Sequence, residues 1–142
     1  MATFRPGKPF RVASLSVDTA FAVGDSTVPF DTFDVDGSFG PSTSGGQVEI
    51  AVAGLYLAIL TLRRIAGAAS AALAATVLLN GVQRARDTAP VAGGAIAASV
   101  VGAWQLDVGD DVVAQVNAGA ASSLEADASQ FVVVRIGPVR WT

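Results

Sequence analysis

Two aspartates in the segment FDVDGSFG, Asp34 and Asp36, have the alternate spacing and following glycine that calcium-binding loops use. An EF-hand loop also needs carboxylates at its first and twelfth positions. In this register those positions are Thr32 and Thr43, so both required carboxylates are missing. The segment therefore predicts a solvated acidic turn and no metal site.

A second acidic group, Asp107, Asp110 and Asp111, lies in the segment DVGDD. Three carboxylates this close could hold a cation where subunits converge. Aspartate and glycine are also the residues that a tight turn selects, because they tolerate its backbone geometry and bond its amides. We favour the turn and predict no metal ligands here.

Acid–base and nucleophilic catalysis have few residues to draw on. The chain contains no His and no Cys, so the usual general base, the usual partner of a serine nucleophile and the thiolate ligands of zinc are all excluded. One lysine, Lys8, is present. No nucleophile–base pair can be recognised, and we predict a protein that is not an enzyme and needs no cofactor.

Few charges are available to solvate a monomer, since 51% of the residues are hydrophobic and 15% are charged, against ~25% charged in a typical domain. Such a chain is expected to cover further surface in an oligomer or in lipid. The net charge is -3, and every charged residue from 15 to 62 is an acid. Nucleic acid binding needs a clustered basic surface, so we expect none.

The segment TVLLNGVQRARD, residues 76–87, has two incompatible interpretations. After the apolar runs 50–62 and 65–79 it could end a membrane-helix hairpin, as in a membrane-active lysis protein. Each run is shorter than the ~20 residues of a spanning helix, and joining them buries two arginines at ~2.5 kcal/mol or more each. Asn-Gly suits a type I′ turn, so we favour a β-hairpin and no membrane partner.

Short apolar segments separated by turn residues recur along the chain. Side chains of QVEIAV, residues 47–52, alternate as in a half-buried strand, whereas LYLAILTLR, residues 55–63, is apolar on both faces. Phe30 and Phe33 are expected core anchors. About eight such strands without a long helix predict an all-β fold, an antiparallel jelly-roll β-sandwich.

Four segments in order, VAGLYLAILTL, AALAATVLLNGVQRAR, WQLDVGDDVVAQV and FVVVRIG, resemble the jelly-roll family shared by tumour necrosis factor and the globular head of the first complement component. The motif residues are Gly54, Tyr56, Asn80, Gly81, Leu106, Gly109, Asp110 and Phe131. Upstream, VPFDTFDVDG followed by VEIAVAGLYL is similar to small virion proteins of tailed bacteriophages. The resemblance implies a homotrimer whose apolar faces meet about a threefold axis.

Six residues are assigned on this basis to the core or the trimer interface: Leu55, Tyr56, Leu57, Ile59, Trp104 and Phe131. Arg63 and Arg64 are expected to face solvent at a strand end. We expect a jelly-roll domain over residues 14–137.

The two ends are expected to attach the domain to a particle. Residues 1–13 form an extended basic arm with two prolines, and residues 138–142 form a tail. The predicted virion-attachment residues are Phe4, Arg5, Lys8, Phe10, Arg11 and Trp141.

The expected function is that of a structural protein of a tailed bacteriophage virion, assembled in the host cytoplasm. We favour a minor tail or tail-tip module in host-surface adhesion or tail assembly, and the alternative is a head decoration protein at threefold capsid positions. The expected partners are its own copies, other virion proteins of the tail or capsid and, further, a host cell-surface glycan or protein.

Overall fold

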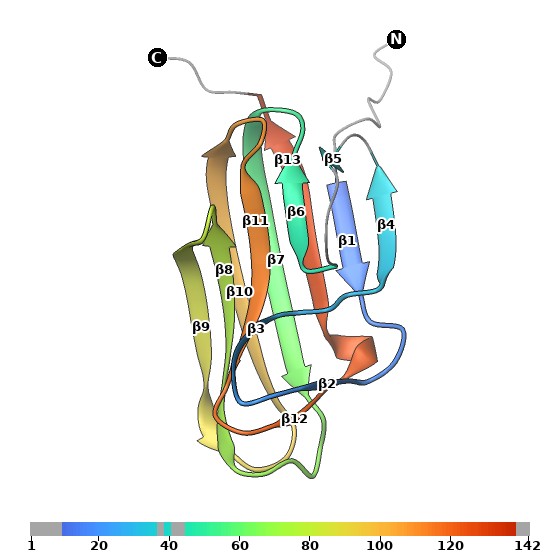
Figure 1. The fold of residues 1–142 in the computed structure, drawn as a ribbon, viewed down its shortest axis with the longest axis vertical. Coiled ribbons are helices and arrows are strands. Elements are labelled where there is room, and N and C mark those ends of the chain that lie inside the picture. Colours follow the sequence, from blue (N-terminus) through green and yellow to red (C-terminus); the bar gives the residue numbers. More distant parts are fainter. Residues whose placement is uncertain (1–9, 37–38, 41–44, 139–142) are drawn as a thin grey trace.

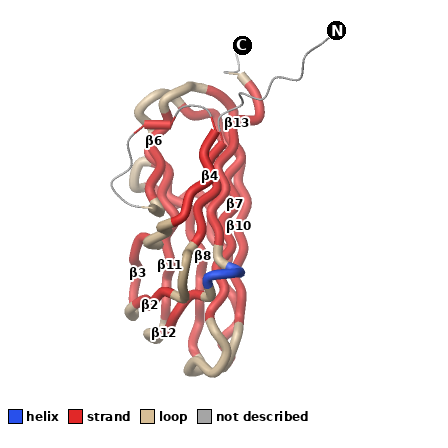
Figure 2. The backbone as a smooth tube through the Cα atoms, turned by 90° about the vertical axis from the view of Figure 1, so that its right-hand side faces the viewer, coloured by secondary structure: helices blue, strands red, loops and turns tan. Residues whose placement is uncertain are grey.

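Two antiparallel β-sheets pack face to face in the computed structural model, which describes residues 10–36, 39–40 and 45–138. Figure 1 shows the long strands running along the long axis, and Figure 2 shows the two layers edge-on. The first sheet contains β2 (Thr19–Phe21), β12 (Ser122–Leu124), β7 (Gly54–Arg64), β13 (Gln130–Gly137), β1 (Phe10–Ser14) and β4 (Thr32–Asp36), with β10 (Ile96–Leu106) also paired to β7.

The second sheet covers the inner face of the first. Its strands are β5 (Phe39–Gly40), β6 (Gln47–Ile50), β11 (Asp111–Ala118), β8 (Ala71–Leu79) and β9 (Val82–Ala92), with β3 (Gly24–Thr27) paired to β11. A short 3-10 turn, η1 (Ala126–Ala128), joins β12 to β13. The architecture confirms the predicted all-β jelly-roll sandwich.

The alanine-rich segment AALAATVLL forms strand β8 although alanine favours a helix. β8 lies between β11 and β9, and most of its residues are buried on both faces. Small side chains fit this central position between two paired strands. Tertiary packing therefore overrides the local preference.

Residues Asn80 and Gly81 make the turn between β8 and β9. Their φ angles are 51° and 81°, both in the left-handed region that a type I′ turn requires. The predicted hairpin is confirmed. The helical membrane hairpin is wrong, because most of the first apolar run lies in strand β7, which continues to Arg64, and the second run contains strand β8. Among the residues that the structure describes, none of the helices has the length and apolar character needed to cross a membrane.

The core lies between the sheets and is made of aliphatic side chains together with the aromatic rings of Phe21, Phe30, Tyr56 and Phe131. Phe30 and Phe131 stack with their ring centroids 6.3 Å apart, and both are buried. Burying a side chain of this size stabilises a fold by about 1.5 to 3 kcal/mol. Phe30 is thus the predicted anchor, whereas Phe33 lies on the edge strand β4 and is 46% exposed, so its assignment to the core is wrong.

Candidate functional site

The outward side of the first sheet carries a continuous group of apolar side chains, which we call the apolar face. In β7 the residues from Gly54 to Leu62 alternate between buried and partly buried, and Arg63 is exposed, so every second residue points away from the core. The apolar face comprises Phe10, Val12, Leu55, Leu57, Ile59, Val101, Ala103, Val132 and Val134.

The strand register brings these residues side by side. Leu57 is paired with Ala103 on one side and with Val134 on the other, and Ile59 is paired with Val101 and Val132. Directly opposed residues in antiparallel strands share a face of the sheet. The apolar face therefore crosses four strands, β10, β7, β13 and β1, in one patch.

Polar residues border the patch toward the lower end of β7 in Figure 1. The Thr61 and Ser99 hydroxyls are hydrogen-bonded at 3.2 Å, and the next outward position, Arg63, pairs with Glu125 at 3.5 Å. A contiguous apolar surface with a polar rim is typical of a protein interface.

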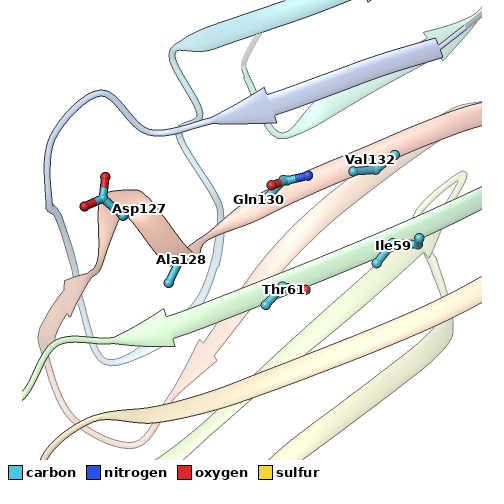
Figure 3. A pocket seen from close by; sticks show the side chains of 6 residues that line it. All are labelled: Ile59, Thr61, Asp127, Ala128, Gln130 and Val132. Carbon is cyan, nitrogen blue, oxygen red and sulfur yellow. The ribbon is translucent and has the colours of Figure 1, made fainter.

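A shallow hollow of about 170 Å³ lies at this border. Figure 3 shows Ile59, Thr61, Gln130 and Val132 along its strands, with Asp127 and Ala128 of η1 at one side. The hollow can take the side chain of a neighbouring protein. It offers no pair of groups for acid–base chemistry.

The six residues predicted for the core or interface separate into two sets. Leu55, Leu57 and Ile59 belong to the apolar face, whereas Tyr56 and Phe131 point inward and are fully buried. The Tyr56 hydroxyl donates a hydrogen bond to the Val52 carbonyl, and burial raises the pKa of that hydroxyl. Trp104 also packs against the core.

Trp104 lies across Gly102 on the inner side of β10. A Cβ added at Gly102 would meet the indole ring 2.1 Å away. Gly102→Ala is therefore expected to push the ring aside, lower stability by about 1 to 3 kcal/mol and shift Trp104 fluorescence to the red. The emission is measured in a Trp141→Phe background.

Gly93→Ala is the matched control for this change, because its Cβ would meet only the Ala68 carbonyl oxygen at 3.7 Å, an ordinary contact. It should leave both stability and emission almost unchanged. Equal effects of the two substitutions would contradict the role assigned to Gly102.

Arg64 is buried, so its assignment to solvent is wrong, while Arg63 is exposed as expected. The Arg64 guanidinium donates to the carbonyls of Gly94 at 3.1 Å and Ala71 at 2.9 Å, and also to that of Ala92. One cation thus joins the end of β7 to the start of β8 and to the turn between β9 and β10.

The predicted arm is shorter than expected, because residues 10–13 belong to β1 and pair with both β13 and β4. Phe10 joins the apolar face. Arg11 is 6% exposed, its guanidinium lies 4.5 Å from the Phe33 ring centroid, and one terminal nitrogen has no hydrogen-bond partner among the described residues. Burial lowers the pKa of Arg11. A buried cation is not an exposed attachment residue, so this part of the prediction is wrong.

The other predicted attachment residues, Phe4, Arg5, Lys8 and Trp141, lie outside the described residues. The start of β1 and the end of β13 are neighbours, since Phe10 is paired with Val134. Both ends of the described chain therefore leave the sandwich at one pole, which is the upper end in Figure 1.

The acidic turn DVGDD forms hydrogen bonds with the neighbouring hairpin. The Asp110 carboxylate accepts bonds from the Asp107 amide at 2.8 Å and from the Asn80 side-chain amide at 3.0 Å. The Asn80 side-chain oxygen accepts a bond from the Asp111 amide at 2.8 Å. Across the described ranges, no group of three or more acidic side chains is arranged to hold a metal ion.

Sequence reasoning missed five residues of the apolar face: Val12, Val101, Ala103, Val132 and Val134. The four consecutive apolar residues of FVVV were a usable signal for the two in β13, because a strand that is apolar on both faces must be covered on both. The other three residues lie in β1 and β10, and the sequence alone does not show that these strands are neighbours of β13 and β7.

No family model matches the sequence, and no curated protein matches it. The fold is similar to the crystal structure of murine APRIL at pH 5.0, with a TM-score of 0.71 and 15% identity over 91% of this chain and 99% of that chain. Eiger TNF from S. frugiperda is also similar, with a TM-score of 0.70 and 12% identity over 96% and 97% of the two chains. The fold is thus a tumour necrosis factor-like jelly roll.

Proposed function

We propose that this chain is a non-enzymatic structural protein of a tailed bacteriophage virion. It forms a homotrimer through the apolar face and acts as a minor tail or tail-tip module in host-surface adhesion or tail assembly. The observation that carries the proposed assembly is the apolar face itself, whose Leu, Ile and Val side chains are not covered by any segment that the structure describes.

A second copy of the chain is the occupant that best fits this face. The outward positions of β7 from Leu55 to Ile59 carry no charge, and a low overall charge makes an isolated monomer poorly solvated. A closed ring buries the same patch in every subunit and ends the assembly at a fixed number. The jelly-roll resemblance favours three.

The position of the chain ends supports a particle-bound knob. Both ends leave one pole, so the segments with Phe4, Arg5, Lys8 and Trp141 can reach one docking partner on the virion. The turns after β7 and β9 lie at the opposite pole (Figure 1). Loops at the free end of a rigid sandwich are suited to recognition.

The virion assignment rests on the likeness of VPFDTFDVDG and VEIAVAGLYL to phage virion proteins. It is tested by mass spectrometry and cryo-electron microscopy of purified particles encoded by the same genome. We expect the chain in the particle, as threefold density on the tail. Density at threefold points of the capsid would assign it to head decoration instead, and absence from purified particles would overturn the proposal.

A further inference from the structure

A polar hollow of about 240 Å³ lies on the outward side of the second sheet, facing away from the apolar face. It crosses β3, β11, β8 and β9, which are neighbours in the sheet (Figure 1). Its lining residues are Asp25, Ala72, Ala74, Arg86, Thr88, Asn117, Ala118 and Gly119. A trimer built on the apolar face would leave this hollow open to solvent.

Small side chains make the floor of the hollow. Ala74 is paired with Asn117 on one side and with Thr88 on the other, so its methyl group separates two polar walls. Ala72 and Gly119 extend the same low floor. Ala74 is 2% exposed, so the accessible part of this floor is Ala72 and Gly119, which can contact the C–H groups of a ligand ring.

One wall is held in place by a buried amide. Asn117 is 6% exposed, and its nitrogen donates to Asp25 Oδ1 at 2.6 Å and to the Gln115 side-chain oxygen at 2.9 Å. Its oxygen accepts a hydrogen bond from the Thr76 hydroxyl at 2.6 Å. Asn117 thereby fixes the Asp25 carboxylate and leaves Oδ2 without a partner among the described residues.

The other wall carries a cation. The Nε of Arg86 contacts the Thr88 hydroxyl at 3.4 Å, and its two terminal nitrogens have no partner in the described part of the chain. Arg86 and Asp25 form no ion pair with each other. The single ion pair within the described ranges joins Arg63 and Glu125. A cation and a carboxylate thus line one hollow, and Asp25 Oδ2 and the two terminal nitrogens of Arg86 have no hydrogen-bond partner among the described residues.

We propose that this hollow binds one uronic acid residue of a glycan. A planar guanidinium pairs with a carboxylate through two hydrogen bonds, which assigns the uronate group to Arg86. The Asp25 carboxylate can accept hydrogen bonds from two adjacent sugar hydroxyls, and the ring lies over the alanine floor. The volume is below the ~300 Å³ of pockets for drug-sized ligands, so it takes a single sugar unit.

The lining disfavours two other ligand classes. Arg86 repels a divalent cation, and Asp25 repels a second negative charge such as that of a phosphate dianion. A ligand with one negative charge, facing Arg86, and neutral hydrogen-bond donors on its other side, facing Asp25, matches both walls of the hollow. The biological source, a host-surface glycan, rests on the proposed adhesion function, but the binding itself is a property of the purified protein.

The test is saturation-transfer NMR on the whole purified chain with D-glucuronate as the probe and inorganic phosphate as the competitor. We expect transfer to glucuronate that phosphate does not abolish at equal concentration. Arg86→Gln should weaken binding at least tenfold, and Ala72→Leu should do the same by filling the floor. Arg84→Gln is the matched control, since Arg84 is exposed at the β9 bulge and outside the hollow.

Three results would overturn the proposal: no transfer to glucuronate, equal competition by phosphate, or an equal loss in the Arg84→Gln variant. Light scattering of the same samples separates this inference from the proposed function. A trimer that does not bind glucuronate would refute the proposed binding site and leave the proposed assembly standing. A monomer that binds glucuronate would refute the proposed assembly and leave the binding site standing.

Discussion

Arg64→Met is expected to lower the melting temperature by roughly 10 °C, equivalent to about 3 kcal/mol of stability. Methionine keeps the length of the side chain but donates no hydrogen bonds. The carbonyls of Ala71, Ala92 and Gly94 then lose their guanidinium partner. Buried acceptors without a partner carry the full cost of their desolvation, so the effect should exceed that of a surface charge. Thermal unfolding at fixed protein concentration measures it.

Arg11→Met is the matched control, because it makes the same change at another buried arginine. One guanidinium nitrogen of Arg11 has no partner in the part of the chain that the structure describes, so burying this side chain is poorly compensated. An apolar replacement removes that cost and loses the contact with the Phe33 ring. The two terms oppose each other, and we expect a change within about 1 kcal/mol. A large loss at Arg11 with none at Arg64 would contradict both assignments.

Local chemistry predicted the strands and the hairpin well. Asn80-Gly81 gave the turn because few dipeptides tolerate two positive φ angles. The alternation in QVEI gave β6, with Val48 and Ile50 buried. Such signals lie within a few residues of the feature that they predict, and no distant contact is needed to interpret them.

The predictions for Arg11, Arg64 and Phe33 failed because distant segments determine their burial. Arg64 is covered by the strand ends at Ala71 and Ala92. Phe33 has the composition of a core residue but lies on an edge strand. The sequence around each residue carries no sign of these neighbours, so solvent for the cation and core for the ring were the natural expectations.

The apolar face and the polar hollow differ in the same way: one could be predicted from local sequence and the other depends on distant segments. The three aliphatic residues of β7 in the apolar face were predictable, because a strand apolar on both sides must be covered twice. The polar hollow was not, since its residues come from four strands, and Asp25 and Asn117 are far apart in the chain. Only the order of the strands in the sheet brings the Asp25 carboxylate and the Arg86 guanidinium to the same hollow.

Leu57→Asp is expected to convert the proposed trimer into a monomer. Leu57 lies at the centre of the apolar face, between Ala103 and Val134. A ring closed on this face would hold one added carboxylate per subunit away from water, at a cost of several kcal/mol each. In the monomer the same carboxylate is solvated. The molar mass measured by light scattering should therefore fall from that of three 14.3 kDa chains to that of one. The melting temperature should no longer depend on protein concentration.

Val91→Asp supplies the control, because Val91 is 67% exposed on β9 and lies outside the apolar face. It adds the same charge and should leave the mass at three chains. Leu57→Met keeps an apolar side chain and should also remain trimeric. If Leu57→Asp does not fold, Leu57→Ser carries the test, since it removes apolar contact without adding a charge and should weaken association at concentrations where the parent stays assembled. A trimer that survives Leu57→Asp with a β-sheet circular dichroism spectrum would place the interface elsewhere, and the apolar face would then need a different partner to cover it.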